Sequence, residues 1–200
     1  MIKYILRYPS LTRFKKTRRI NLKKNIKLLI LNAIIASLYI IINQIFYFLS
    51  FDAVQFRIAE VLMILILFNV RYIYGLTLGV AIANLFSPMG LIDVGFGTLA
   101  TFVALLLIVL LKKVLKPYLV YIFLPLVNGI IIGLMIKYFY APELNLYLCM
   151  LYVFIGEFLV IYLLGIPIYY LLNGNQKFRD FLIIDDKNDS KNFYFPDIDV

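Results

Sequence analysis

The sequence contains no histidine and only one cysteine, Cys149. These absences exclude a His-based catalytic triad, an intrachain disulfide and a zinc site built from Cys and His. The phosphate-binding pattern GxxxxGK[ST] is also absent, because Gly75-Leu-Thr-Leu-Gly79 leads into Val80 and Ala81. No pairing of a nucleophile with a base stands out either. We therefore predict that the chain is not an enzyme, carries no ATPase of its own and needs no metal or cofactor.

Charged residues are scarce, whereas apolar runs cover most of the chain. Hydrophobic residues make up 64% of the sequence and charged residues 16%, and the mean hydropathy is +0.93. A helix needs roughly 20 apolar residues to cross a bilayer, and the long runs lack the alternation expected of barrel strands. The predicted fold class is all-α: a polytopic membrane protein with about six transmembrane helices in one bundle.

Short polar turns separate the apolar segments. The second and third segments are short, with only Asn69-Val70-Arg71-Tyr72 between them. They are either tilted pieces of the bundle or segments that pack behind their neighbours without crossing the full bilayer. The expected segments are 26–49, 56–70, 73–86, 91–111, 118–140 and 146–172.

Positive charge is concentrated ahead of the first segment. About half of the 20 Lys and Arg residues lie within residues 1–27. A basic block beside a span usually stays in the cytoplasm and contacts anionic lipid, so we expect no nucleic acid partner despite the net charge of +9. Three parts are predicted: a cytoplasmic basic arm (1–25), a transmembrane substrate-binding domain (26–172) and a cytoplasmic polar tail (173–200).

The turn charges agree with this orientation. With the N-terminus in the cytoplasm, the basic residues Arg71, Lys112, Lys113 and Lys116 also lie inside. The outer turns are then acidic or neutral, and Lys137 is a mild exception whose long side chain can reach the outer surface. We predict a multi-pass protein of the cell membrane with both termini in the cytoplasm. The outer turns carry Asp52, Ser87-Pro88-Met89-Gly90 and Pro142-Glu143.

Polar side chains from separate segments gather toward the outer half of this bundle. An ionisable group at membrane depth costs several kcal/mol unless it meets a partner or a cavity, so each is a functional candidate. Their convergence suggests a pocket open to the outside, whose carboxylates and amides suit a flat, polar heterocycle. The candidate substrate-binding residues are Gln55, Arg57, Glu60, Asn84, Asp93, Asn128 and Glu157.

Each candidate also has a purely structural interpretation. Arg57 and Glu60 are three residues apart, so they would share a helix face and form an internal ion pair. Asp93 is equally well explained as an N-cap of the fourth helix, and Asn84 and Asn128 as interhelical hydrogen-bonding residues. Glu157 has no Lys or Arg within one helical turn. It therefore needs a partner from another helix, a ligand or a proton.

Two further patterns concern contacts. The aromatic residues Phe46, Phe56, Phe96 and Tyr152 are candidates to stack on a bound heterocycle. Small residues also recur at spacings that let helix backbones approach. We predict internal packing for the stripes Gly75-xxx-Gly79-xxx-Ala83 and Gly129-xxx-Gly133, and a partner-docking role for Ala33 and Ser37 on the first helix.

Several sequence blocks together form a recognisable pattern. They are Val54-Gln-Phe-Arg-Ile-Ala-Glu60, Ala83-Asn84-Leu85, Gly90-Leu-Ile-Asp-Val-Gly-Phe-Gly-Thr-Leu-Ala100, Val127-Asn128-Gly129, Gly156-Glu157 and Leu164-Gly-Ile-Pro167. In this order they resemble the queuosine-precursor transporter (QueT) family, which are substrate-binding S components of energy-coupling-factor (ECF) transporters. The resemblance covers roughly residues 28–172.

The resemblance implies a six-helix S component that binds a 7-deazaguanine base, such as a queuosine precursor or queuine, from outside. It also implies two kinds of partner, a transmembrane coupling subunit and a pair of cytoplasmic ATPases. The resemblance further implies that small residues of the first helix contact the partner subunit. The corresponding residues here are Ala33 and Ser37, and Ser37 departs from the alanine of the family pattern. Alternatives are an S component for another small nutrient, such as a vitamin, and a structural membrane protein whose buried charges merely pair.

Overall fold

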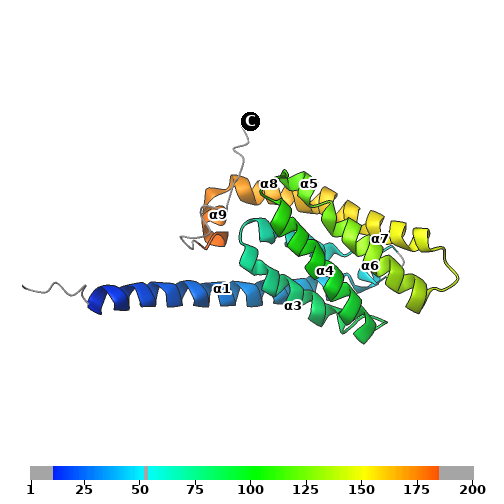
Figure 1. The fold of residues 1–200 in the computed structure, drawn as a ribbon, viewed down its shortest axis with the longest axis horizontal. Helices are drawn as coiled ribbons and strands as arrows, with labels where there is room; N and C mark the ends of the chain where they lie inside the picture. The colour runs from blue at the N-terminus through cyan, green and yellow to red at the C-terminus, as the bar shows by residue number, and fades with distance from the viewer. Residues whose placement is uncertain (1–10, 52–53, 185–200) are drawn as a thin grey trace, which may run out of the picture.

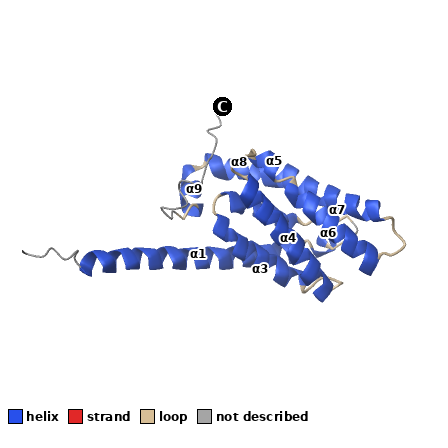
Figure 2. Cartoon of the chain, in the orientation of Figure 1, coloured by secondary structure: helices blue, strands red, loops and turns tan. Residues whose placement is uncertain are grey.

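The computed structural model of the chain describes residues 11–51 and 54–184, with side chains from residue 22 onward. Residues 1–10 of the predicted arm, Asp52 and residues 185–200 of the predicted tail lie outside the described residues. The described part is built of helices and turns, without strands (Figure 2). Four helical stretches within it are long and apolar enough to cross a membrane, namely 22–45, 91–111, 117–140 and 146–174. The predicted fold class, a polytopic helical membrane protein, is confirmed.

The first helix is longer at its N-terminal end than the hydropathy predicts. Helix α1 (Leu11–Ile45) begins inside the predicted basic arm and ends before Leu49, where a separate turn of helix, α2 (Tyr47–Ser50), follows. Residues 11–25 contain no Pro or Gly and are rich in Lys, Arg and Leu, which favour helix. The blue end of α1 accordingly extends past the rest of the bundle (Figure 1).

The second apolar segment is not a membrane-spanning α-helix. Residues Ile58–Leu67 form a 3₁₀ helix, η1, and a second short 3₁₀ helix, η2 (Val70–Tyr72), leads into α3 (Ile73–Asn84). The side chains of Ala59, Met63 and Ile66 are fully buried, and η1 packs against α1, α4, α7 and η4. A 3₁₀ helix rises about 2 Å per residue, so η1 is too short to cross a bilayer. It is an internal element packed behind its neighbours.

After α3 the chain forms three long helical stretches, 91–111, 117–140 and 146–174. Helix α4 is a single long helix, whereas the fifth and sixth apolar segments each begin or end with shorter helical pieces, two of them π-helical (η3 and η4). Figure 1 shows α4, α6 and α7 side by side, with α3 between α4 and α1. These elements are α4 (Leu91–Leu111), α5 (Pro117–Val120), α6 (Phe123–Met135), η3 (Ile136–Tyr140), α7 (Leu146–Val160), η4 (Ile161–Gly165), α8 (Ile166–Gly174) and α9 (Gln176–Leu182).

Glycines allow two helix pairs to pack closely. A Cβ on Gly75 would lie 2.5 Å from the main-chain oxygen of Asn32, so α3 packs directly on α1. A Cβ on Gly133 would lie 2.6 Å from the Cα of Met150, which fixes α6 against α7. Real Cβ atoms do not tolerate such distances, so both pairs depend on glycine. The prediction that these two stripes serve internal packing is confirmed.

Helix α9 is attached to the transmembrane helices at the end of the bundle opposite the turns that precede α4 and α7 (Figure 1). The hydroxyl of Tyr72 donates to the carbonyl of Leu182 at 2.6 Å, and Lys27 Nζ donates to the carbonyl of Phe181 at 2.8 Å. The same Lys27 ammonium lies 4.8 Å from the centre of the Phe181 ring. Part of the predicted polar tail is therefore an ordered helix held against α1 and η2.

Candidate functional site

The polar segment at residues 54–60 enters the bundle through tight turns ahead of η1, in which Phe56, Arg57 and Ile58 each donate their main-chain N–H to the carbonyl two residues earlier. Residues 55–57 are not helical, and Arg57 (φ −77°, ψ 78°) precedes the first residue of η1. The main chain of Gln55 lies directly on α7, where a Cβ on Gly156 would come within 2.7 Å of the Gln55 carbonyl oxygen. Gly156 therefore makes the space that this segment occupies, next to Glu157.

Arg57 and Glu60 form the ion pair expected from their spacing. Arg57 Nη1 lies 3.8 Å from Glu60 Oε1, and the two side chains are 1% and 0% exposed. The pairing does not use a shared α-helical face, because Arg57 stands just outside the 3₁₀ helix. None of the three guanidinium nitrogens has a hydrogen-bond partner among the described residues. The guanidinium, which has five N–H donors, therefore keeps donors available.

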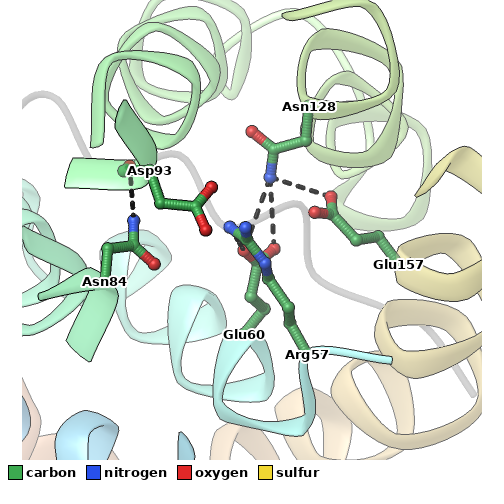
Figure 3. Close-up of polar contacts among 6 residues, drawn as sticks. All are labelled: Arg57, Glu60, Asn84, Asp93, Asn128 and Glu157. Carbon is green, nitrogen blue, oxygen red and sulfur yellow. Dashed lines mark hydrogen bonds and ion pairs between the residues drawn. The ribbon is translucent and has the colours of Figure 1, made fainter. Parts of the chain in front are cut away.

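Asn128 joins the carboxylates of two different elements. Its Nδ2 donates to Glu157 Oε2 at 2.8 Å and lies 3.4 Å from both oxygens of Glu60. Figure 3 shows Asn128 and Glu157 pointing toward the Arg57–Glu60 pair. The partner that Glu157 requires from another helix is thus Asn128 of α6. Asn128 and Glu157 are fully buried, so these groups lie deep between η1, α6 and α7.

Asn84 and Asp93 lie on the other side of Arg57. The Nδ2 of Asn84 donates to the main-chain oxygen of Asp93 at 3.1 Å, which ties the end of α3 to the first turn of α4. Interpreting Asp93 as an N-cap is wrong: the N-cap of α4 is Gly90, and no side chain caps this helix end. The Asp93 side chain is 3% exposed and points toward the Arg57–Glu60 pair (Figure 3). The carboxylate is therefore available for another contact.

A pocket of about 530 Å³, counting its open mouth, lies next to this cluster. Among the predicted site residues Gln55 and Asp93 line it, and of the predicted aromatic residues Tyr152 does. Phe96 instead packs against Phe139, with the ring centres 5.7 Å apart.

Most of the pocket wall was not predicted from the sequence. Phe51, Tyr140 and two methionines contribute to the wall, together with residues of the turns that precede α4 and α7. Most of the wall residues lie in or next to the polar turns of the sequence. This nearness could have identified them, because loops at one end of a bundle surround the same space. The wall residues absent from the predicted set are Phe51, Pro88, Met89, Met135, Ile136, Tyr140, Ala141, Leu144 and Cys149.

Buried oxygens without partners mark the same region. Within residues 22–51 and 54–184, buried polar atoms that lack any hydrogen bond include Gln55 Oε1, Asp93 Oδ1, Asn128 Oδ1 and Glu157 Oε1. Nearly all buried polar groups in folded proteins are hydrogen-bonded, and leaving one unsatisfied costs about 1–3 kcal/mol. Four acceptors in one cluster, together with the unused donors of Arg57, match a site shaped for a polar ligand.

The predicted docking residues Ala33 and Ser37 lie on the side of α1 that faces away from the other helices. Both are exposed in the structure, whereas the adjacent Ala36 is buried against Gly79 of α3. Large apolar neighbours on the same side, Ile30, Ile34 and Ile41, are also exposed. The stripe therefore faces away from the bundle, toward lipid or another protein.

Comparison with known proteins gives one match. The family described as "QueT transporter" matches residues 29–174, which is well over half of the chain and includes every predicted site residue. No curated protein and no solved structure is similar enough to count as a match.

Proposed function

Since the chain belongs to the QueT transporter family and is a membrane transport protein, we propose that it is the substrate-binding S component of an ECF importer. Its ligand is a queuosine precursor, a 7-deazaguanine base or queuine, taken up from outside the cell. The cluster of buried acceptors around Arg57 carries the proposal: Gln55, Asp93, Asn128 and Glu157 each hold an oxygen without a partner.

The chemistry of a deazaguanine fits these groups. The base offers a ring N–H and an exocyclic amine side by side, and one carboxylate can accept from both in a charge-assisted arrangement. Glu157, with Oε1 unpartnered and Oε2 held by Asn128, is the side chain assigned to that role. Arg57 has unused N–H donors for the base carbonyl. Glu60 keeps the guanidinium in place through the ion pair.

The positive-inside rule supports uptake from outside. The turns that contribute Pro88, Met89, Ala141 and Leu144 to the pocket wall carry no excess of Lys and Arg, whereas Arg71 and Lys112 belong to turns at the other end. With both termini in the cytoplasm, the mouth of the pocket faces outward. The substrate then enters from the outside and leaves toward the cytoplasm after the protein changes conformation.

We propose that partner subunits supply the energy for this conformational change. The sequence has no phosphate-binding loop, so two cytoplasmic ATPases and a transmembrane coupling subunit supply it. The exposed stripe of Ala33 and Ser37 on α1 is the proposed contact with the coupling subunit, because small residues let another helix approach closely. Under this assignment the chain acts as a transport subunit rather than an enzyme.

A thermal-shift measurement on the purified protein tests the proposal. A ligand that binds only the folded state stabilises it by about 2.7 kcal/mol when its concentration is 100 times Kd. We expect deazaguanine bases to raise the melting temperature and unrelated vitamins to leave it unchanged. No shift with any deazaguanine at concentrations well above micromolar would overturn the substrate assignment. A shift with a vitamin instead would assign the pocket to a different nutrient.

A further inference from the structure

The short helix α9 has an apolar face and a polar face. At 3.6 residues per turn, Phe178, Phe181 and Leu182 lie on one side of the helix. Gln176 and Asp180 lie on the opposite side. Leu182 packs against the core of the bundle, whereas Phe178 and Phe181 are 54% and 52% exposed. The described part of the chain therefore leaves two neighbouring aromatic side chains half uncovered.

Contacts at both ends of α9 hold this face in position. Asn175 separates α9 from α8 in an extended conformation (φ −94°, ψ 105°), and its side chain caps the first turn of α9. At the other end, Lys27 and Tyr72 donate hydrogen bonds to two carbonyls at the end of the helix. Figure 1 shows α9 turning across the end of the bundle instead of continuing along α8. Since the apolar stretch 146–174 ends just before α9, the exposed rings lie at the edge of the hydrocarbon layer.

Positive charge surrounds α9 at this end of the bundle. Apart from Arg57 and Lys137, every Lys and Arg within residues 22–51 and 54–184 lies in the first turns of this part of α1, in η2, in the turn after α4 or in α9 itself. The acidic residue among them is Asp180. Such an excess of cations attracts an anionic surface. The cations are Lys23, Lys24, Lys27, Arg71, Lys112, Lys113, Lys116, Lys177 and Arg179.

An anionic lipid bilayer matches both features of this end. Lipid phosphates attract Lys and Arg, and exposed aromatic rings insert at the boundary between the headgroups and the acyl chains. A protein partner would have to present an apolar surface and an acidic surface side by side to match the same face. A bilayer presents the two layers in this order to any helix that lies at its edge. The charge and the position of α9 therefore favour lipid as the partner.

We propose that α9 is an interfacial helix, which inserts Phe178 and Phe181 into the headgroup region of an anionic bilayer while the surrounding cations pair with lipid phosphates. The proposal is independent of the ligand assigned to the pocket. It gives a membrane contact to part of the segment 173–200, for which the sequence predicts only a polar tail. Because α9 is hydrogen-bonded to α1 and η2, it also holds their ends at the membrane surface.

Tryptophan fluorescence tests the position of α9, because the chain contains no tryptophan. Phe178→Trp puts an indole on the apolar face, and Gln176→Trp puts one on the polar face of the same helix. Both positions are exposed, so both variants should fold. In bilayers that contain phosphatidylglycerol, lipids brominated on the acyl chains should quench Phe178→Trp roughly twofold more strongly than Gln176→Trp. Equal quenching of the two variants overturns the proposal.

Hydrogen exchange of the unmodified protein tests the role of lipid charge. Amides of residues 176–182 should exchange several-fold more slowly in bilayers with phosphatidylglycerol than in bilayers of phosphatidylcholine alone. High salt should remove most of this difference, because it screens charges at the surface. The same exchange rate in both bilayers overturns the pairing with anionic lipid. Protection that appears only when another protein is bound assigns this face to a protein contact and also overturns the proposal.

Discussion

The side-chain nitrogen of Asn128 lies 2.8 Å from Glu157 Oε2 and 3.4 Å from both oxygens of Glu60. One amide on α6 thus contacts a carboxylate on α7 and another on η1. A single amide nitrogen cannot satisfy four carboxylate oxygens. Some of the oxygens of Glu60 and Glu157 therefore remain able to accept further hydrogen bonds. These spare acceptors are the basis of the proposed ligand site and of the predictions below.

Replacing Glu157 by Gln should abolish most ligand binding while leaving the protein folded. The substitution keeps the shape and the contact with Asn128 but removes the charge that strengthens hydrogen bonds from the base. A hydrogen bond to a charged group contributes about 1.5–3 kcal/mol, so Kd should rise roughly 10- to 150-fold. Titration of the purified variant with a deazaguanine measures this.

The control for this change is Glu143→Gln, the same substitution at an exposed position in the turn before α7, which should bind normally. Uptake that is unaffected by Glu157→Gln, accompanied by a change in melting temperature, would instead favour a structural protein whose buried charges merely pair.

Replacing Gly156 by Ala should displace the segment that carries Gln55 and Arg57. The added methyl would lie 2.7 Å from the Gln55 carbonyl oxygen, and overpacking of this kind costs about 1–3 kcal/mol. Ligand affinity should fall together with the melting temperature, as titration and thermal unfolding would show. Gly95→Ala is the matched control, because a Cβ at Gly95 meets nothing within 4 Å. If Gly156→Ala binds and melts like Gly95→Ala, the main chain at Gln55 is not held by α7.

Replacing Ser37 by Trp should weaken association with the coupling subunit without changing ligand affinity. The exposed face of α1 is far from the buried carboxylates, and a large side chain keeps a second helix from approaching closely. Co-purification of the assembled transporter provides the measurement. Leu99→Trp places the same residue on an exposed position of α4 and should assemble normally. If the two variants assemble equally well, Ala33 and Ser37 do not form the contact with the coupling subunit.

Replacing Tyr72 by Phe should loosen α9. The change deletes the 2.6 Å hydrogen bond to the Leu182 carbonyl, a contribution of about 1 kcal/mol, so local opening should become roughly fivefold more frequent. Hydrogen exchange of residues 176–182 should speed up accordingly. Tyr74→Phe, at a side chain that is 72% exposed, should leave the exchange unchanged. Unchanged exchange in Tyr72→Phe would mean that this hydrogen bond does not hold α9 against the bundle.

Local patterns were sufficient for several features of the protein. Hydropathy identified the class and the long helices, because a bilayer imposes the same length and apolarity on every span. The spacing of Arg57 and Glu60 predicted their ion pair, although the two residues do not share a helix face, because Arg57 stands just before the 3₁₀ helix that contains Glu60. The boundaries were less accurate: α1 begins at Leu11, and the second segment is a 3₁₀ helix rather than a span.

The sequence by itself determined that the chain is a helical membrane protein and that polar side chains come from several of its apolar segments. Only the tertiary structure decided which of them meet. The contact between Asn128 and Glu60 joins residues 68 apart in sequence, and the pocket walls combine residues of three separate turns with residues of α4, α6 and α7. Such contacts depend on how each helix is rotated and how closely it packs, which Gly75, Gly133 and Gly156 set through main-chain contacts across the bundle. Hydropathy carries no information on that rotation, because lipid-facing and core-facing side chains are equally apolar.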